Sequence, residues 1–130
     1  MDEVRIGIVG MGRGSGHLSR LLRTPGARVV ACADRILERR ERAREIAGDA
    51  PVQVFAEYEE MLAQADLDAV IVATNGRLQA RHTIQALSAG CHVISEVPGC
   101  FTVEEAHHIV ATVQRTGRKY MLAENSAFMD

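Results

Sequence analysis

The chain has 130 residues, a length that predicts one domain over residues 1–130. Apolar residues make up 47% of it and charged residues 25%, which is typical of a globular protein and excludes a disordered or fibrous chain. A net charge of −2 and an aromatic content of 4% argue against nucleic acid or an anionic membrane surface as the partner, and favour a small ligand or a protein.

The sequence shows few features of an exported, membrane-spanning or disulfide-bonded protein. The first residues, Met-Asp-Glu, lack the basic segment of a signal peptide, and no apolar run approaches the roughly 18 to 20 residues of a membrane span. The three cysteines, Cys32, Cys91 and Cys100, are odd in number and show no C-x-x-C spacing, which indicates buried thiols rather than a disulfide framework or a metal site. We therefore expect a cytoplasmic protein with no metal and no membrane contact.

Short apolar runs alternate with stretches of helical periodicity along the whole chain. The apolar runs predict six strands, at residues 4–9, 28–33, 52–55, 69–73, 92–95 and 119–123. Helices are predicted between them, at residues 18–22, 35–47, 58–65, 78–89 and 102–117. The alternation implies right-handed crossovers, and the continuous apolar run at 69–73 is typical of a strand buried on both faces. The pattern predicts an α/β fold with a doubly wound, mostly parallel sheet and helices on both faces.

The apolar spacing of two helices predicts which residues face the core. In the helix at 35–47 they are Ile36, Ala43, Ile46 and Ala47. In the last helix, which opens on a Thr102-x-x-Glu105 capping box, they are Val103, Ala106, Val110 and Val113. The charges of the 35–47 helix include the i,i+4 pair Glu38 and Arg42, which indicates a solvated face rather than a nucleic-acid site.

A cluster of glycines lies between the first predicted strand and the first predicted helix. Gly10 and Gly12 fit the first two positions of G-x-G-x-x-G, and Ser15 takes the third, where its small size still permits close packing of the helix on the strand. Glycine lets the backbone approach a pyrophosphate, and the helix N-terminus supplies a positive dipole. A purely structural turn is the alternative. The loop residues expected to hold a dinucleotide are Gly10, Met11, Gly12, Arg13 and Gly14.

Asp34 stands at the end of the second predicted strand, 24 residues after Gly10. A carboxylate there can accept hydrogen bonds from the hydroxyls of an adenosine ribose and repels a 2′-phosphate, which favours NAD over NADP. Arg35 leaves NADP open, because its guanidinium can stack on adenine or pair with that phosphate. Thr74 and Asn75, at the carboxyl end of the fourth strand, are expected to line the crevice that a dinucleotide crosses.

Four segments together resemble a known family. They read G-I-V-G-M-G, A-C-A-D-R, V-I-V-A-T-N and A-L-S-A-G-C-H-V-I-S-E-V-P, and they are similar to the N-terminal NAD(P)-binding Rossmann domain of the Gfo/Idh/MocA oxidoreductases. The resemblance covers nearly the whole chain. It implies hydride transfer on a sugar, a cyclitol or a related polyol, and it places Glu96, Val97, Pro98 and Asn125 around the nicotinamide.

The chain departs from the family pattern in two places. Family members carry Glu-Lys-Pro where this chain has Glu96-Val97-Pro98, and valine can neither donate a hydrogen bond nor hold a charge. A branch with the same Glu-Val-Pro includes NAD-requiring glycosidases. The family's T-P-N-x-x-H is T-N-G-R-L-Q here, and we interpret the later His82 as a helix residue. Pro98 is a candidate cis-proline, with an ordinary trans proline as the alternative, and the role of His17 stays open.

Catalytic residues are not assigned by the sequence, because no Ser/His/Asp or Cys/His set and no carboxylate pair is evident. In the family, substrate-binding and acid–base residues come from a C-terminal domain that we expect to be absent from this chain. A sugar-like substrate would then bind only if a second domain is supplied, and exposed apolar surface would permit a homo-oligomer. The alternatives are a free-standing regulatory nucleotide sensor without turnover and the cofactor half of an NAD-dependent glycosidase.

Overall fold

The computed structural model describes residues 2–125, which form one six-stranded sheet with the strand order β3-β2-β1-β4-β5-β6. Every strand pairing is parallel, so the predicted doubly wound α/β fold is confirmed. The strands are β1 (Val4–Val9), β2 (Ala27–Ala33), β3 (Gln53–Phe55), β4 (Ala69–Val72), β5 (His92–Ser95) and β6 (Tyr120–Leu122). The helices are α1 (Gly14–Leu21), α2 (Leu37–Ala47), α3 (Tyr58–Gln64), α4 (Gly76–Ser88) and α5 (Val103–Thr116).

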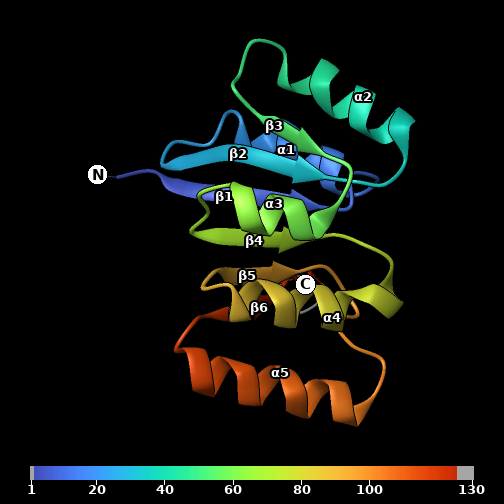
Figure 1. Ribbon diagram of the computed structural model, residues 1–130, viewed down its shortest axis with the longest axis vertical. Coiled ribbons are helices and arrows are strands. Elements are labelled where there is room, and N and C mark those ends of the chain that lie inside the picture. Colours follow the sequence, from blue (N-terminus) through green and yellow to red (C-terminus); the bar gives the residue numbers. More distant parts are fainter. Residues whose placement is uncertain (1, 126–130) are drawn as a thin grey trace.

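Helices lie on both faces of the sheet (Figure 1). On one face, Leu18 of α1 packs in a core cluster with Ile8 of β1. On the other, Met61 of α3 packs in a second cluster with Val70 and Val72 of β4. These five side chains are fully buried because β1 and β4 lie at the centre of the sheet. Burying a side chain of this size stabilises a fold by about 1.5–3 kcal/mol, so these contacts help to hold the helices on the central strands.

Two helices begin at caps that the sequence supplies. Oδ1 of Asn75 accepts the N–H of Arg77 at 2.9 Å at the start of α4. At the start of α5, Oγ1 of Thr102 accepts the N–H of Glu105, and Oε1 of Glu105 accepts the N–H of Thr102, both at 3.0 Å. The predicted capping box is therefore confirmed. Because such caps each contribute about 1 kcal/mol, they fix the points where the loops after β4 and β5 turn into helices.

The inward face of α5 agrees only in part with the prediction, in that Val113 packs against the core as expected. Val103 and Val110 are 72% and 54% exposed, whereas Ile109 and Thr112 are buried. Thr112 can face the core because its hydroxyl donates to the carbonyl of His108 at 2.7 Å, which leaves no polar group unpaired. The apolar pattern predicted that Val103 and Val110 face the core. It did not predict the burial of Thr112, whose hydroxyl is satisfied within its own helix.

Ile36 also lies elsewhere than predicted. It is the residue before the first turn of α2, in an extended backbone conformation, and its side chain is 44% exposed. Ala43 of the same helix is buried as predicted. The helix therefore starts at Leu37, two residues later than predicted, and Ile36 is left at the carboxyl end of β2, beside Asp34.

No helix within residues 2–125 is long and apolar enough to cross a membrane. Cys32, Cys91 and Cys100 are free cysteines, and the first two are buried. Burial raises the pKa of the Cys32 thiol to about 11, which keeps the thiol protonated and unreactive at neutral pH. The cytoplasmic location stays a prediction.

Candidate functional site

The loop after β1 makes very close contact with the carboxyl end of β4. Gly10 has a φ of +88°, and a Cβ atom there would lie 2.7 Å from the carbonyl of Ala73 and the nitrogen of Thr74. The N–H of Gly10 donates to the carbonyl of Ala33 at 2.9 Å, which ties the same residue to the end of β2. Only glycine fits this position, so the loop backbone lies directly on the sheet edge where parallel α/β folds bind ligands.

Helix α1 packs closely on β1 through Gly14. A Cβ atom at Gly14 would lie 2.7 Å from Cγ2 of Ile8. We expected this close approach at Ser15, but Ser15 instead donates its hydroxyl to the carbonyl of Gly12 at 2.8 Å. The third glycine of the loop therefore serves packing between the helix and the strand, one residue before the expected position.

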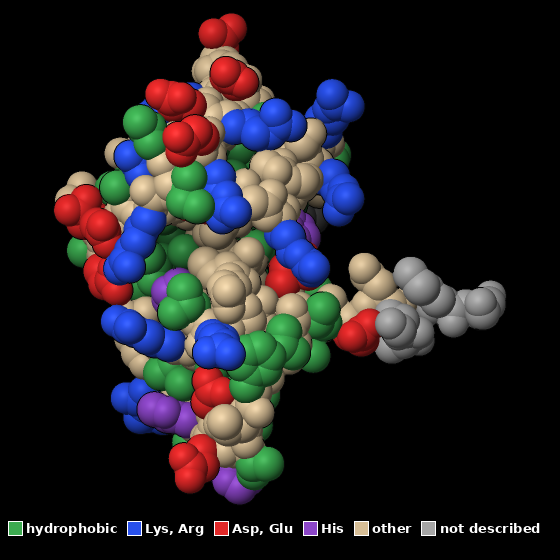
Figure 2. Space-filling model, turned by 90° about the vertical axis from the view of Figure 1, so that its right-hand side faces the viewer, with side chains coloured by type: hydrophobic (Ala, Val, Ile, Leu, Met, Phe, Trp, Pro, Cys, Tyr) green, Lys and Arg blue, Asp and Glu red, His purple; other side chains and the backbone are tan. Residues whose placement is uncertain are grey.

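A cavity of about 640 Å³ opens at the carboxyl ends of β1, β2 and β4. Its volume lies within the range of small-ligand sites, about 300–1,000 Å³. Figure 2 looks onto this edge of the sheet and shows basic side chains distributed around it. The cavity brings together seven of the predicted site residues: Gly10, Gly12, Arg13, Asp34, Arg35, Thr74 and Asn75.

The carboxylate of Asp34 is held in this cavity by two backbone hydrogen bonds. Its side chain is only 7% exposed. Oδ2 accepts the N–H of Met11 and Oδ1 accepts the N–H of Ile36, both at 2.8 Å. The side chain of Met11 is buried, so this residue contributes its backbone N–H to the site. Because each oxygen of an ionised carboxylate can accept about two hydrogen bonds, Asp34 keeps acceptor capacity for a ligand.

Two arginines flank Asp34 in different ways. Nε of Arg35 lies 3.4 Å from Oε2 of Glu57, and the Arg35 side chain is 80% exposed. Nη1 of Arg39 lies 3.6 Å from Oδ2 of Asp34, and the same guanidinium lies against Gly12. The cation beside the carboxylate is therefore Arg39. The sequence could not single it out, because α2 carries several arginines and only tertiary packing decides which of them faces the cavity.

The cavity is also lined by residues that the sequence did not indicate as site residues. Ile36 and Leu78 line it and are 44% and 42% exposed, which leaves two apolar side chains facing the open space. Tyr58 and Arg81 also line it. Apolar walls with a few polar groups are typical of a small-ligand site. No local sequence signal marks these residues, since they come from α3, α4 and the segment before α2, which only the fold brings together.

His82 is a helix residue, as predicted, but it also lines the cavity. Its Nδ1 lies 3.0 Å from Oγ1 of Thr74, its ring centroid lies 4.7 Å from that of Tyr58, and its carbonyl accepts the Tyr58 hydroxyl at 2.6 Å. Burial lowers the pKa of His82. The site therefore presents a neutral imidazole at pH 7, held in place by its neighbours on two sides.

The residues after β5 form a second cluster outside this cavity. Oε1 of Glu96 lies 2.6 Å from Nε2 of His17, and Oε2 lies 3.7 Å from Nη1 of Arg13. The Val97–Pro98 peptide bond is cis, which settles the alternative left open by the sequence. His17 thus contacts a predicted site residue across the end of the sheet, which its position in the sequence did not indicate.

Gln79 joins the loops that follow β4 and β5. Its Nε2 donates to the carbonyls of Thr74 at 2.9 Å and Val97 at 3.3 Å, and its Oε1 accepts the N–H of Gly99 at 2.7 Å. The side chain is almost completely buried. The residue that replaces the expected histidine therefore holds the two loops together. Asn125, the remaining predicted residue, is exposed at a bend beyond β6.

Comparison with known proteins agrees with this arrangement. Residues 4–124 match the model of an oxidoreductase family described as having an NAD-binding Rossmann fold, Gfo/Idh/MocA. The chain belongs to the Gfo/Idh/MocA oxidoreductase family. The family resemblance and the NAD cofactor predicted from the sequence are confirmed.

Three similar proteins show how much of a family member the chain represents. Glycosyl hydrolase family 109 protein 1 of Bacteroides fragilis is 32% identical over 98% of this chain and 29% of its own length. Scyllo-inositol dehydrogenase of Lactobacillus casei, solved with NAD(H) and scyllo-inositol, is 27% identical with a TM-score of 0.88, over 99% of this chain and 38% of that one. The WlbA dehydrogenase of Bordetella pertussis, solved with NADH and UDP-GlcNAcA, is 27% identical with a TM-score of 0.85, over 96% and 36%. This Gfo/Idh/MocA chain thus spans less than a third of the curated relative.

Proposed function

We propose that this domain holds NAD for hydride transfer to or from a carbon atom of a sugar, a cyclitol or a related polyol. The observation that carries the proposal is the ordered carboxylate of Asp34, placed at the cavity beside a loop in which only glycine fits at position 10. Solved neighbours of the same fold hold NAD(H) with scyllo-inositol, or NADH with UDP-GlcNAcA. The substrate class rests on these neighbours.

The cavity residues fit a dinucleotide. Gly10 and Gly12 leave the loop backbone accessible to a pyrophosphate, and Arg13 adds positive charge there. Asp34 has remaining acceptor capacity for the hydroxyls of an adenosine ribose. Bound NAD supplies the hydride acceptor, and as NADH the donor. The chain's own residues bind and orient it.

NAD is the proposed cofactor in preference to NADP. The ionised Asp34 would repel a 2′-phosphate on the ribose that it binds. Arg35, which the sequence left as a partner for that phosphate, lies beside Glu57 instead. Arg39 lies beside Asp34, where it offsets part of the negative charge. Weak NADP binding is therefore expected, at lower affinity than NAD.

Proton transfer and substrate binding are proposed to come from a further domain. Val97 cannot exchange a proton. Such a domain would follow residues 1–130, and the sugar-like substrate would bind between the two domains. A homo-oligomer stays a prediction.

A second candidate function is the cofactor half of an NAD-dependent glycosidase. The Glu96-Val97-Pro98 triplet favours it, as does the relative described as a glycosyl hydrolase of family 109. In such an enzyme the hydride would return to the substrate, so that no net NADH forms. The two candidates therefore differ in a measurable product.

The experiment is an activity assay on the complete product of the gene, with NAD⁺ and a panel of cyclitols, hexoses and UDP-sugars. NADH formation with a member of the panel supports the dehydrogenase. Release of nitrophenol from a nitrophenyl glycoside that requires NAD⁺ but yields no net NADH supports the glycosidase. Binding of NAD⁺ with neither reaction would support the regulatory sensor and overturn both enzymatic proposals.

A further inference from the structure

The cavity extends beyond Asp34 to a part that is lined by two neighbouring helices. Tyr58 and Glu59 of α3 and His82 of α4 line this part. In the proposed function, Asp34 binds the ribose of the adenosine. The residues predicted to surround the nicotinamide follow β5 and β6 and do not line this cavity. The part lined by α3 and α4 is therefore left for the adenine base that the first ribose carries.

Two of the side chains that line the cavity are apolar. Ile36, after β2, and Leu78, near the start of α4, are 44% and 42% exposed. The broad faces of a purine are apolar, whereas its hydrogen-bonding groups lie along its edge. These two side chains can contact the faces of a base, but they do not distinguish one purine from another. Any such selection has to come from the polar side chains of the cavity.

The ring of His82 is held so that one of its nitrogens can donate. Burial lowers the pKa of His82, so the ring is neutral at pH 7 and carries a single hydrogen. Nδ1 lies 3.0 Å from Oγ1 of Thr74. We assign the hydrogen of this hydroxyl to Nδ1, because no other acceptor within residues 2–125 lies at hydrogen-bonding distance from it. The ring hydrogen is then on Nε2, for which the same residues supply no partner.

The carboxylate of Glu59 provides an acceptor near this donor. A hydrogen bond from its own backbone N–H lowers the pKa of Glu59, which is therefore ionised at pH 7 and only accepts. Its charge acts on His82 and partly offsets the effect of burial on the histidine pKa. The Glu59 side chain is 50% exposed, and Oε1 lies 3.4 Å from Nε2 of Gln85 and 4.0 Å from Nη2 of Arg81. Because an ionised carboxylate has about four acceptor sites, Glu59 keeps capacity for a ligand.

We propose that His82 and Glu59 select adenine as the base of the dinucleotide, with Nε2 of His82 donating to N1 of the base and Glu59 accepting its 6-amino group. The proposal rests on the proposed function, since it needs a dinucleotide in the cavity. Adenine presents an acceptor at N1 beside a donor at its 6-amino group. Hypoxanthine and guanine present the reverse, a hydrogen on N1 and a 6-oxo group. Against these bases, the histidine N–H would face a donor and the carboxylate would face an acceptor.

The test compares two dinucleotides that differ only at this edge of the base. Nicotinamide hypoxanthine dinucleotide has the riboses, the pyrophosphate and the nicotinamide of NAD⁺, but its base carries a 6-oxo group and a hydrogen on N1. Calorimetric titrations of the 130-residue chain measure both affinities. We expect NAD⁺ to bind on the order of tenfold more tightly, because the analogue leaves the histidine and the carboxylate without their partners.

Variants of the two side chains should reduce this preference. Glu59→Gln should narrow the ratio of the two affinities by about threefold to tenfold, because an amide can either accept from an amino group or donate to an oxo group. His82→Phe keeps a ring against Tyr58 but loses the donor, and should narrow the ratio to a similar extent. Two controls, Glu60→Gln and His107→Phe, change exposed residues that do not line the cavity and should leave the ratio as it is.

The ratio separates selection of the base from a merely structural role. If His82 only held Thr74 and Tyr58 in place, His82→Phe would weaken both dinucleotides equally. That result, or equal affinities of the wild-type chain for the two dinucleotides, would overturn the selection of adenine and leave NAD binding intact. If His82→Phe does not fold, the half-exposed Glu59→Gln decides the question. A wild-type chain that binds neither dinucleotide would overturn the proposed function and this inference with it.

Discussion

The backbone N–H of Met11 donates to Oδ2 of Asp34 at 2.8 Å, although 23 positions separate the two residues in the chain. This bond joins the glycine loop after β1 to the acid after β2 within the domain itself. The carboxylate is therefore oriented before a ligand arrives, and less ordering is left to oppose binding.

Asp34→Asn should lower the affinity for NAD⁺ about tenfold to a hundredfold. The substitution keeps the shape of the side chain but removes the charge, and hydrogen bonds to charged groups contribute about 1.5–3 kcal/mol. It should also narrow the preference for NAD⁺ over NADP⁺, because the repulsion of a 2′-phosphate is lost. Titration calorimetry with both nucleotides measures these changes. Asp49→Asn, at an exposed site after α2, is the matched control. Equal affinities of the two variants for NAD⁺ would contradict the role of Asp34.

Gly10→Ala should destabilise the domain by roughly 2–4 kcal/mol. The new Cβ would lie 2.7 Å from backbone atoms of Ala73 and Thr74, and the φ of +88° is unfavourable for alanine. Gly16→Ala is the control, since Gly16 is helical and a Cβ there meets nothing within 4 Å. That variant should gain about 0.5–1 kcal/mol. Urea denaturation measures both, and a stable Gly10→Ala protein would show that the loop does not lie as described.

The sequence predictions agree best with the structure where each depends on neighbouring residues in the chain. The strands were predicted within one or two residues because each is a short apolar run, and the capping box was found because Thr102 and Glu105 have a fixed spacing. The glycine loop and Asp34 were found for the same reason. On α5, Val113 packs against the core as predicted, whereas the burial of Thr112 was missed because its hydroxyl is satisfied inside its own helix.

The remaining site residues depend on packing between distant elements. Arg39 was one of several arginines in its helix, and only the approach of α2 to Gly12 selects it. His82 was assigned to a helix, but its contact with Tyr58 and the cavity needs α3 and α4 to lie side by side. His17 likewise meets Glu96 only because β5 lies beside β4 in the sheet. No pattern in one sequence specifies such contacts.

Gln79→Leu should destabilise the domain by about 1–3 kcal/mol. Leucine fills a similar space but leaves the buried N–H of Gly99 and the carbonyls of Thr74 and Val97 without their side-chain partner. Chemical denaturation measures the effect. The corresponding change at exposed Gln114 should fall within about 0.5 kcal/mol of the wild type. A Gln79→Leu protein as stable as the Gln114 variant would show that the amide does not join the two loops.

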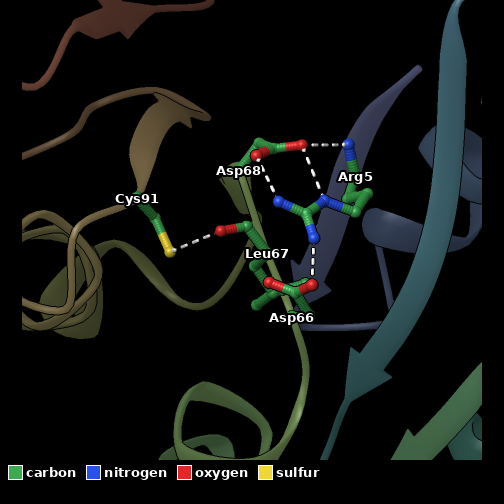
Figure 3. Close-up of polar contacts among 5 residues, drawn as sticks. All are labelled: Arg5, Asp66, Leu67, Asp68 and Cys91. Atoms are coloured by element: carbon green, nitrogen blue, oxygen red, sulfur yellow. Dashed lines mark hydrogen bonds and ion pairs between the residues drawn. The ribbon is translucent and has the colours of Figure 1, made fainter. Parts of the chain in front are cut away.

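The ion pairs of Arg5 predict a loss of stability in acid. At the opposite end of the sheet, Arg5 binds Asp68 through its side chain and its backbone N–H, and also pairs with Asp66 (Figure 3). Hydrogen bonds from Arg5 hold the pKa of Asp68 at about 2, against an ordinary 3.8. Because the folded-state pKa is the lower one, this stabilisation is complete above about pH 4 and is lost as the pH falls toward 2.

Asp68→Asn should therefore lower Tm at pH 7, and its difference from the wild type should shrink between pH 4 and pH 2. The effect at pH 7 is expected to be modest, since the Asp68 side chain is 37% exposed and solvent screens the pair. Thermal denaturation followed over pH measures it. A difference that stays constant down to pH 2 would contradict the shifted pKa.

The most direct test of the central claim, that the cavity around Asp34 binds NAD, is a calorimetric titration of the purified 130-residue chain with NAD⁺. We expect saturable binding of one NAD⁺ per chain, with a weaker response to NADP⁺ under the same conditions. Absence of NAD⁺ binding up to millimolar concentration would contradict it.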